Sequence, residues 1–294
     1  MDRLRQAFEI GEHPLSLRSR RAADRGGFVL EELEFLTADG EAVRGFLTRP
    51  PHDRPVPAIL CIHAHGFQYQ IGASELLDGR LSLLSPVGSV FPGMGFAALM
   101  IDMPGFGVRA DPSESARTKA RLWRGKSEAG QMVGELAAVF DWLAARDDII
   151  ADRVGVFGIS MGATLGYWLA SVEARIACVA HLCCFADFGT LIETGAHDLH
   201  GIYLTVPGLL NIASNGEIAG RIAPRPQLIA IGNLDPLTPP AAVDLALGQT
   251  RTAYAALGAN ANLIVHREPD SGHVETPAIR DAVLAFLRRH LGPA

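Results

Sequence analysis

Six short, continuous apolar runs constrain the fold of this chain more than any other feature. They are residues 58–62, 96–101, 154–158, 176–180, 227–231 and 262–265. Strands that are apolar along their whole length are buried on both faces, as in a parallel sheet. Between the runs, apolar side chains recur at helical spacing, most clearly over 132–143 and 279–287. This alternation predicts an α/β fold with a mostly parallel central sheet and helices on both of its faces.

The segments outside this alternation predict the remaining organisation. Residues 28–36 and 42–48 flank Ala38-Asp39-Gly40, which indicates a β-hairpin at one edge of the sheet. Residues 1–26 are basic, and we interpret them as an N-terminal helical extension. Residues 182–224 are too long for a plain crossover, and we interpret them as a short cap insertion over the carboxyl ends of the strands, where ligands bind in open α/β sheets. We therefore expect a single domain over residues 1–294.

The strongest local motif is Gly158-Ile159-Ser160-Met161-Gly162, which follows an apolar run and precedes a helix-like segment. This is the strand–turn–helix context of a nucleophile elbow. Side chains two positions before and after the serine would collide with the strand and the helix, so glycine is expected at both places. The turn also sets Ser160 at a helix N-terminus, which favours developing negative charge.

A serine hydroxyl needs a base to take its proton, and the base needs an acid to orient it. His273 lies in a loop between the last apolar run and the last helix. Asp235 lies just beyond the run 227–231, in a loop containing several prolines. The order Ser160, Asp235, His273 is that of α/β hydrolases. Asp270 is the rival acid, but a loop so short seldom turns an aspartate back onto its own histidine.

The oxyanion of an acyl-transfer reaction needs two preorganised donors. We expect one to be the backbone N–H of Met161 and the other to come from the loop after 58–62. In that loop His65 is favoured, with Gly66 and Phe67 as alternatives. The pair His63 and His65 could also suggest a metal site, but no third ligand has a suitable spacing. No metal and no other cofactor is predicted.

Aromatic side chains on the oxyanion loop and in the cap are candidates for substrate binding: Phe67, Phe185, Phe188 and Tyr203. The alternative is that they attach the cap to the sheet. The polar segment 110–127 between them in sequence is interpreted as a solvated loop that could also edge the pocket.

The chain resembles the α/β-hydrolase superfamily along most of its length, and within it the dienelactone-hydrolase-related and acetyl-xylan-esterase-related branch. The resemblance rests on residues 61–67, 101–107, 152–166, 221–239 and 270–273. It implies the α/β-hydrolase fold and an esterase-like hydrolase that uses Ser160, Asp235 and His273. Dienelactone hydrolase itself has a cysteine nucleophile where this chain has Ser160. Many relatives also read His-Gly where this chain has His63-Ala64.

Composition and charge limit the classes of binding partner that this chain can have. A net charge of −6 and a pI of about 5.9 argue against nucleic acid or an anionic membrane. The sequence has no apolar stretch fit for a signal peptide and no run long enough to span a bilayer. Its four cysteines lie in or beside apolar runs, as buried thiols do. We expect a cytoplasmic protein. A homodimer is one of the assemblies that the sequence allows.

Three functions fit these residues. The first is hydrolysis of a carboxylic ester of a small molecule through an acyl-enzyme intermediate. The second is hydrolysis of a C–C bond or a thioester with the same triad, which fold and triad cannot separate from the first. The third is a non-catalytic ligand-binding protein that keeps the fold, against which the intact nucleophile, base and acid argue.

Overall fold

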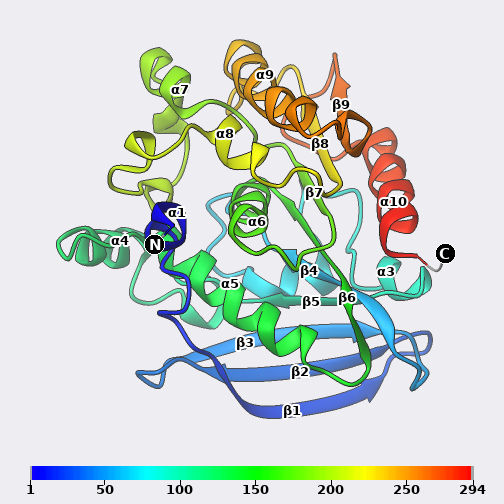
Figure 1. Ribbon diagram of the computed structural model, residues 1–294. Coiled ribbons are helices and arrows are strands. Elements are labelled where there is room, and N and C mark those ends of the chain that lie inside the picture. The colour runs from blue at the N-terminus through cyan, green and yellow to red at the C-terminus, as the bar shows by residue number, and fades with distance from the viewer. Residues whose placement is uncertain (1, 293–294) are drawn as a thin grey trace.

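A single nine-stranded sheet organises the computed structural model, which describes residues 2–292 (Figure 1). The strand order is β1-β2-β3-β5-β4-β6-β7-β8-β9. The strands are β1 (Ser16–Asp24), β2 (Val29–Leu36), β3 (Ala42–Arg49), β4 (Val56–Ile62), β5 (Ala97–Ile101), β6 (Ile149–Ile159), β7 (Val179–Leu182), β8 (Gln227–Gly232) and β9 (Leu263–Glu268). Strands β4 to β9 pair in parallel, which confirms the predicted α/β class.

Alternate residues of the parallel strands enter two separate cores, one on each face of the sheet. In β4, Leu60 and Ile62 belong to one core, while Ile59 and Cys61 belong to the other. Helices α5 (Glu128–Ala144), α6 (Met161–Val172), α8 (Asn215–Gly220) and α9 (Pro240–Ala256) cover the first face. Helices α2 (Glu75–Asp78), α3 (Val90–Gly93) and α10 (Pro277–Leu291) cover the second. Burial on both faces explains the continuous apolar runs within the central strands β4, β5 and β8.

The predicted hairpin is present and extends the sheet at one edge. Strands β2 and β3 pair from Val29↔Arg49 to Leu36↔Ala42, and Gly40 in the turn has a φ of 86°. A positive φ is readily adopted by glycine, so Gly40 suits this turn and the prediction of a hairpin from Asp39-Gly40 is confirmed.

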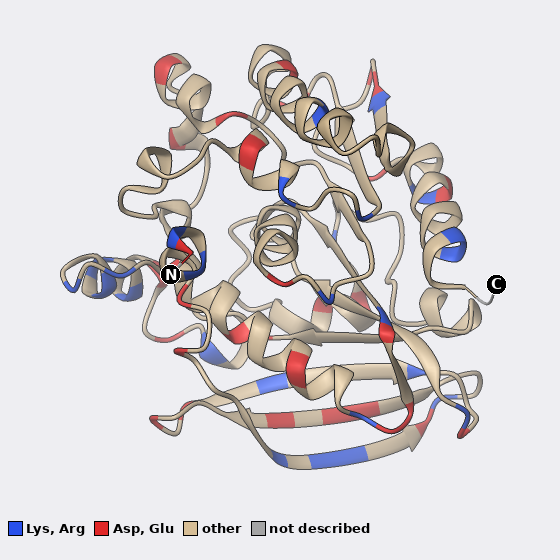
Figure 2. Cartoon of the chain, in the orientation of Figure 1, with Lys and Arg blue, Asp and Glu red and all other residues tan. Residues whose placement is uncertain are grey.

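The expectation of a helical extension over residues 1–26 is wrong for most of its length. Only α1 (Arg3–Ala7) is helical, and β1 runs antiparallel to β2 along its whole length. Arg18 lies 2.9 Å from Glu34 across this pair, and Figure 2 shows the basic band of β1 beside acidic residues of β2. Helix propensity is a weak preference, and here the backbone bonds and cross-strand charges of an exposed edge strand override it.

The polar segment 110–127 is also not a plain loop. It contains α4 (Glu114–Leu122), which begins where the Ser113 side chain accepts a hydrogen bond from the N–H of Ala116. Arg121 and Lys119 lie in its last turn, where positive charge is favourable. Trp123 just beyond the helix is 91% exposed, whereas Glu114 at its start is buried. The segment therefore combines a solvated face with one buried acid.

The segment between β7 and β8 forms short helices above the sheet. They are α7 (Phe188–Thr194), η3 (Ala196–Leu199), η4 (Ile202–Leu204), η5 (Leu209–Asn211) and α8. We call residues 183–226 between the two strands the cap. Figure 1 shows it on the side of the molecule away from the β1–β3 edge. Within residues 2–292, no helix combines the length and the apolar character needed to cross a bilayer.

One buried acid at the start of α5 lacks the partners that usually accompany such a group. The side chain of Glu128 is fully buried, and neither of its oxygens has a hydrogen-bond partner in the described chain. The Nε atom of Arg121 lies 3.9 Å away. Burial raises the pKa of Glu128 from 4.5 to about 7.

We expect the variant Glu128→Gln to be more stable than the wild type at about pH 8, by on the order of 1–3 kcal/mol. Between pH 4.5 and about 7 the folded carboxyl holds a proton that the unfolded one has lost, so wild-type stability falls as pH rises through this window. Urea unfolding at about pH 5 and about pH 8 measures the difference, which should nearly vanish at the lower pH.

Glu135→Gln is the matched control for this experiment, because Glu135 is equally buried but lies 2.6 Å from Arg109. Loss of its charge leaves the buried guanidinium of Arg109 with Glu41 as its remaining carboxylate partner, so this variant should be less stable at both pH values. A Glu128→Gln protein that is destabilised at the higher pH would contradict the interpretation.

Candidate active site

Ser160 occupies the turn between β6 and α6 with a strained backbone. Its φ is 59° and its ψ is −122°, a conformation that residues other than glycine rarely adopt. The N–H of Ser160 donates to the carbonyl of Leu182 at the end of β7, at 2.8 Å. This anchor to the neighbouring strand holds the turn in place, and the strain is that expected of a nucleophile elbow.

The two glycines of the elbow are required by close backbone contacts. A Cβ on Gly158 would lie 2.3 Å from the carbonyl group of Gly162. A Cβ on Gly162 would lie 2.0 Å from the carbonyl oxygen of Ile62, at the end of β4. The predicted steric reason is therefore present, and the contact made by Gly162 also brings the start of α6 against the loop that follows β4.

His273 and Asp235 meet above the ends of β8 and β9. His273 Nδ1 lies 2.6 Å from Asp235 Oδ2, and the other carboxylate oxygen accepts the N–H of Leu237 at 2.9 Å. Asp235 is 2% exposed, whereas the His273 side chain is 23% exposed. Asp270 is exposed and makes no bond to His273. The geometry thus pairs the imidazole with Asp235 and leaves its Nε2 open.

A second close approach holds the histidine loop against the acid loop. The N–H of Leu234 donates to the carbonyl of Ser271 at 2.8 Å. A Cβ on Gly232 would lie 2.3 Å from the carbonyl oxygen of Gly272. Glycine at the end of β8 therefore lets the two loops touch, which fixes the separation of acid and base.

The loop after β4 contains the second group of candidate donors. The N–H of Ala64 is taken by the Glu75 carboxylate, at 3.0 Å, and the N–H of Phe67 by Nδ1 of His65, at 3.1 Å. In the described structure the backbone N–H groups of His65 and Gly66 make no hydrogen bond. These bonds favour His65, or Gly66, over Phe67 as the partner of Met161.

The buried ion pair of Glu75 and Arg80 supports the same loop through hydrogen bonds to its backbone. Arg80 Nε lies 2.5 Å from Glu75, and the two terminal nitrogens of Arg80 donate to the carbonyls of His65 and Ala64, each at 3.0 Å. Burial raises the pKa of Glu75, and the positive charge of Arg80 opposes that rise. Nothing in the local sequence indicates this ion pair, because a Glu and an Arg five positions apart are common on exposed helices.

His63 and His65 use their ring nitrogens within the protein. His63 Nδ1 lies 3.0 Å from the carbonyl of Ala64, and its Nε2 accepts the N–H of Met103 at 3.1 Å. Burial lowers the pKa of His63 to about 3, so this ring is neutral. His65 likewise has partners at both nitrogens. These residues are arranged as structural histidines rather than as a metal site.

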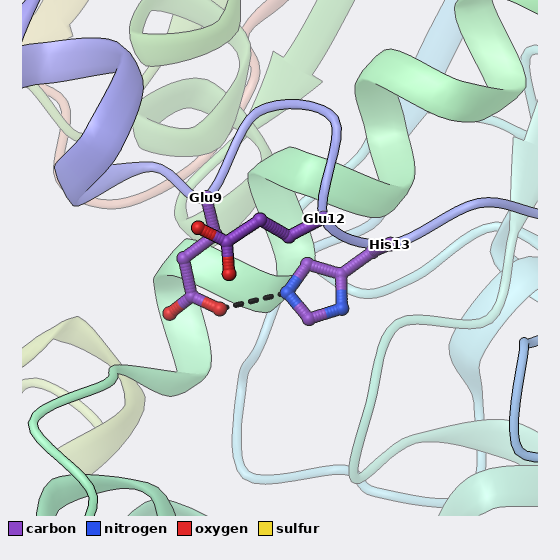
Figure 3. Close-up of side chains that lie close together, drawn as sticks. All are labelled: Glu9, Glu12 and His13. Atoms are coloured by element: carbon purple, nitrogen blue, oxygen red, sulfur yellow. Dashed lines mark hydrogen bonds and ion pairs between the residues drawn. The ribbon is translucent and has the colours of Figure 1, made fainter.

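Within residues 2–292, one group of three side chains has the spacing of metal ligands, and it lies away from this site. It consists of Glu9, Glu12 and His13, which point toward one another in Figure 3. Glu9 already accepts hydrogen bonds from His13, from Arg121 and from the N–H of Ser127. The charge of Glu9 is therefore balanced by Arg121, without a metal ion.

A cavity of about 510 Å³ lies within the cap, and all of its lining residues belong to the cap. Its lining is mostly apolar and consists of Phe188, Leu191, Ile192, His197, Asp198, His200, Gly201, Ile202, Leu204, Thr205, Val206, Leu209 and Leu210. Of the four predicted binding residues, Phe188 lines this cavity. Phe67 is 63% exposed, whereas Phe185 and Tyr203 are buried in packing contacts.

His200 links the cavity to the acid loop, and the sequence analysis did not single it out. Its Nε2 donates to the carbonyl of Leu237 at 3.0 Å, two residues beyond Asp235. Burial lowers the pKa of His200, and the nearby His273 adds to this effect. The polar run His197-Asp198-Leu199-His200 inside an otherwise apolar cap was the available signal.

The sheet order, the strained serine at the strand–helix turn and the histidine and acid after the last two strands define an enzyme of the α/β-hydrolase class. Residues 39–219 match the family model of the X-Pro dipeptidyl-peptidases (S15 family), and the chain belongs to this family. The sequence analysis identified the superfamily and did not anticipate this family.

Comparison with individual proteins agrees with this class. The chain is 35% identical over 297 residues to "Putative hydrolase YtaP" of Bacillus subtilis (strain 168), covering 99% of both chains. The solved acetyl xylan esterase from Paenibacillus sp. R4 is 18% identical, with a TM-score of 0.69 over 99% of this chain and 93% of that one. A glucuronoyl esterase from Solibacter usitatus is 12% identical, with a TM-score of 0.70 over the same shares. The fold expected from the acetyl-xylan-esterase-related branch is confirmed.

Proposed function

We propose that this hydrolase cleaves the carboxylic ester of a small molecule through an acyl-enzyme intermediate formed on Ser160. The observation that carries the proposal is the 2.6 Å bond between His273 Nδ1 and the buried Asp235, in loops after β8 and β9 at the same edge of the parallel sheet as the elbow after β6. An exposed carboxylate would be solvated and would orient a histidine weakly. The acetyl xylan esterase and the glucuronoyl esterase of the same fold add support, since both are esterases by name.

The proposed reaction assigns one role to each group. Ser160 Oγ attacks the ester carbonyl carbon while His273 Nε2 takes its proton, and Asp235 holds the imidazole tautomer and stabilises the imidazolium. The oxyanion is bound by the N–H groups of Met161 and His65. His273 then gives the proton to the departing alcohol. A water molecule, activated by the same histidine, cleaves the acyl-enzyme and restores Ser160.

The cap cavity is the proposed site for one side of the substrate. Its volume of about 510 Å³ and its lining of Leu, Ile, Val and Phe side chains suit an apolar acyl or alcohol group. We infer that the binding partner is a small-molecule ester. Cytoplasmic location and a homodimer stay predictions from the sequence.

A dipeptidyl-peptidase activity is the second candidate, and the family match favours it. A peptide with a free N-terminus would need an acid to bind its ammonium group, and Asp198 lies on the cavity wall. Parallel assays of p-nitrophenyl acetate, an acyl thioester and glycyl-prolyl-p-nitroanilide separate ester, thioester and peptide hydrolysis. A β-diketone substrate tests C–C hydrolysis by the same triad.

We expect Ser160→Ala to lower kcat by about 10⁴ to 10⁶, leaving the contributions of the oxyanion hole and binding. A fluorophosphonate probe should label the wild type and not the variant, as mass spectrometry of the intact protein would show. Labelling of another serine, or near-normal activity of the variant, would overturn the assignment.

We expect Asp235→Asn to keep the fold and to lower kcat by roughly 10⁴, since asparagine favours the wrong tautomer of His273. Asp270→Asn is the matched control, because Asp270 lies in the histidine loop without contacting the ring. Its kcat should stay within about 3-fold of the wild type, a change worth less than 1 kcal/mol. If Asp270→Asn were the more damaging change, the acid would be misassigned.

We expect Phe188→Ala to shift the preference of the enzyme toward bulkier esters, by about 1–3 kcal/mol in relative kcat/KM, because it enlarges the cavity. A series of p-nitrophenyl esters of increasing acyl length measures the shift. Leu199→Ala is the control, since Leu199 lies in the same cap, is 48% exposed and does not line the cavity. Equal profiles for the two variants would place the substrate elsewhere.

A further inference from the structure

Glu114 is a buried acid that contacts two parts of the site at once. One carboxylate oxygen accepts hydrogen bonds from His65 Nε2, at 3.0 Å, and from the hydroxyl of Tyr69, at 2.8 Å. The other accepts the backbone N–H of Tyr203, at 3.0 Å. His65 and Tyr69 lie after β4, and Tyr203 belongs to the cap. The first residue of α4 therefore joins the cap to the proposed oxyanion loop.

His65 is fixed by these contacts in one orientation. Since Nδ1 accepts the N–H of Phe67, Nε2 carries the proton that it donates to Glu114. The ring of Tyr203 stacks on the imidazole with a centroid distance of 5.3 Å and an interplanar angle of 20°. Tilting the ring would break both hydrogen bonds and the stacking, so the backbone of His65 is held through its own side chain.

The cap passes unusually close to the bond between His65 and Glu114. A Cβ on Gly201 would lie 2.6 Å from His65 Nε2 and 2.8 Å from a carboxylate oxygen of Glu114. Nothing larger than glycine fits at this position without a shift of the cap or the ring. Gly201 also lines the cap cavity, so this contact adjoins the proposed substrate site.

The carboxylate of Glu114 remains charged without an arginine or lysine bonded to it in the described chain. Burial raises its pKa, but the hydrogen bond from His65 and the electrostatic attraction of that ring, with the hydrogen bonds from Tyr203 and Tyr69, outweigh burial and leave the pKa lowered. A charged acceptor holds its donors more strongly than a neutral one. The side chain is therefore suited to orient a histidine rather than to transfer a proton.

We propose that Glu114 is a positioning residue for the oxyanion hole, which holds the His65 N–H in place by fixing the His65 ring and docking the cap on it. This inference rests on the proposed ester hydrolysis. A preorganised donor acts where negative charge develops, in the transition state rather than in the bound substrate. Loss of Glu114 should consequently lower kcat and change KM little, whereas a purely structural role would lower stability alone.

Two variants test this with different chemistry. Glu114→Gln keeps the shape of the side chain but removes its charge and replaces one of its two acceptor oxygens with an NH2 group, which faces a donor on either side. Gly201→Ala displaces the cap without changing a polar group. For both, we expect kcat with p-nitrophenyl acetate to fall about 10- to 100-fold, below the loss of a whole oxyanion donor. Lys119→Ala is the control, since Lys119 is exposed on the same helix. Its kcat should equal that of the wild type.

The readout is the kcat and KM of folded protein, together with the rate of inactivation by a fluorophosphonate, whose tetrahedral adduct also places an oxygen in the oxyanion hole. Parallel losses in kcat and inactivation rate, with KM within about 3-fold, support the positioning role. Unchanged kcat per folded molecule in either variant overturns it. If one variant does not fold, the other decides.

The same experiment separates failure of this inference from failure of the proposed function. A wild type that hydrolyses the ester, beside an inactive Ser160→Ala, establishes the reaction, and a normal Glu114→Gln then rejects only the role of Glu114. A wild type without esterase activity, or an active Ser160→Ala, rejects both.

Discussion

The close contact between the start of α6 and the end of β4 is the constraint on which the rest of the site depends. Gly162 lies so near the carbonyl of Ile62 that not even a methyl group fits between them. This contact places the N-terminus of α6, and with it Ser160 and the N–H of Met161, beside the loop 63–67. Only a glycine permits it, so the position of the proposed nucleophile is set by backbone packing and not by side-chain bonds.

Three buried glutamates show different ways of placing a carboxylate inside this protein. Glu75 is paired with Arg80 at 2.5 Å, and together they hold the backbone of the oxyanion loop. Glu114 accepts hydrogen bonds from His65, Tyr69 and the backbone of Tyr203, which belong to two segments far apart in sequence. Glu128 has neither, and its raised pKa follows. Glu75 and Glu114 orient the loop 63–67 because each accepts a hydrogen bond from it, Glu75 from the N–H of Ala64 and Glu114 from the ring of His65.

The sheet and the proposed triad follow from local sequence, whereas the elements that support them do not. Continuous apolar runs identify β4 and β8 because burial on both faces leaves few polar positions. The elbow is recognisable because a side chain at Gly158 or Gly162 would collide with neighbouring backbone, so glycine is required at both positions. In contrast, β1 forms because β2 offers a partner, which helix propensity cannot reveal. Glu114 has three partners at sequence distances of 45 to 89 residues, so no local pattern marks it.

The cap is attached to both halves of the proposed catalytic machinery. Through Glu114 it contacts the oxyanion loop, and through His200 it contacts the carbonyl of Leu237, next to the acid. His200, which makes one of these contacts, and Gly201, which lies beside the other, both line the cavity. A substrate that moves the cap would therefore act on the oxyanion donor and the acid loop together. If the substrate binds in the cavity as proposed, we expect its binding to be coupled to the alignment of the proposed catalytic groups, as when remote binding energy supports catalysis.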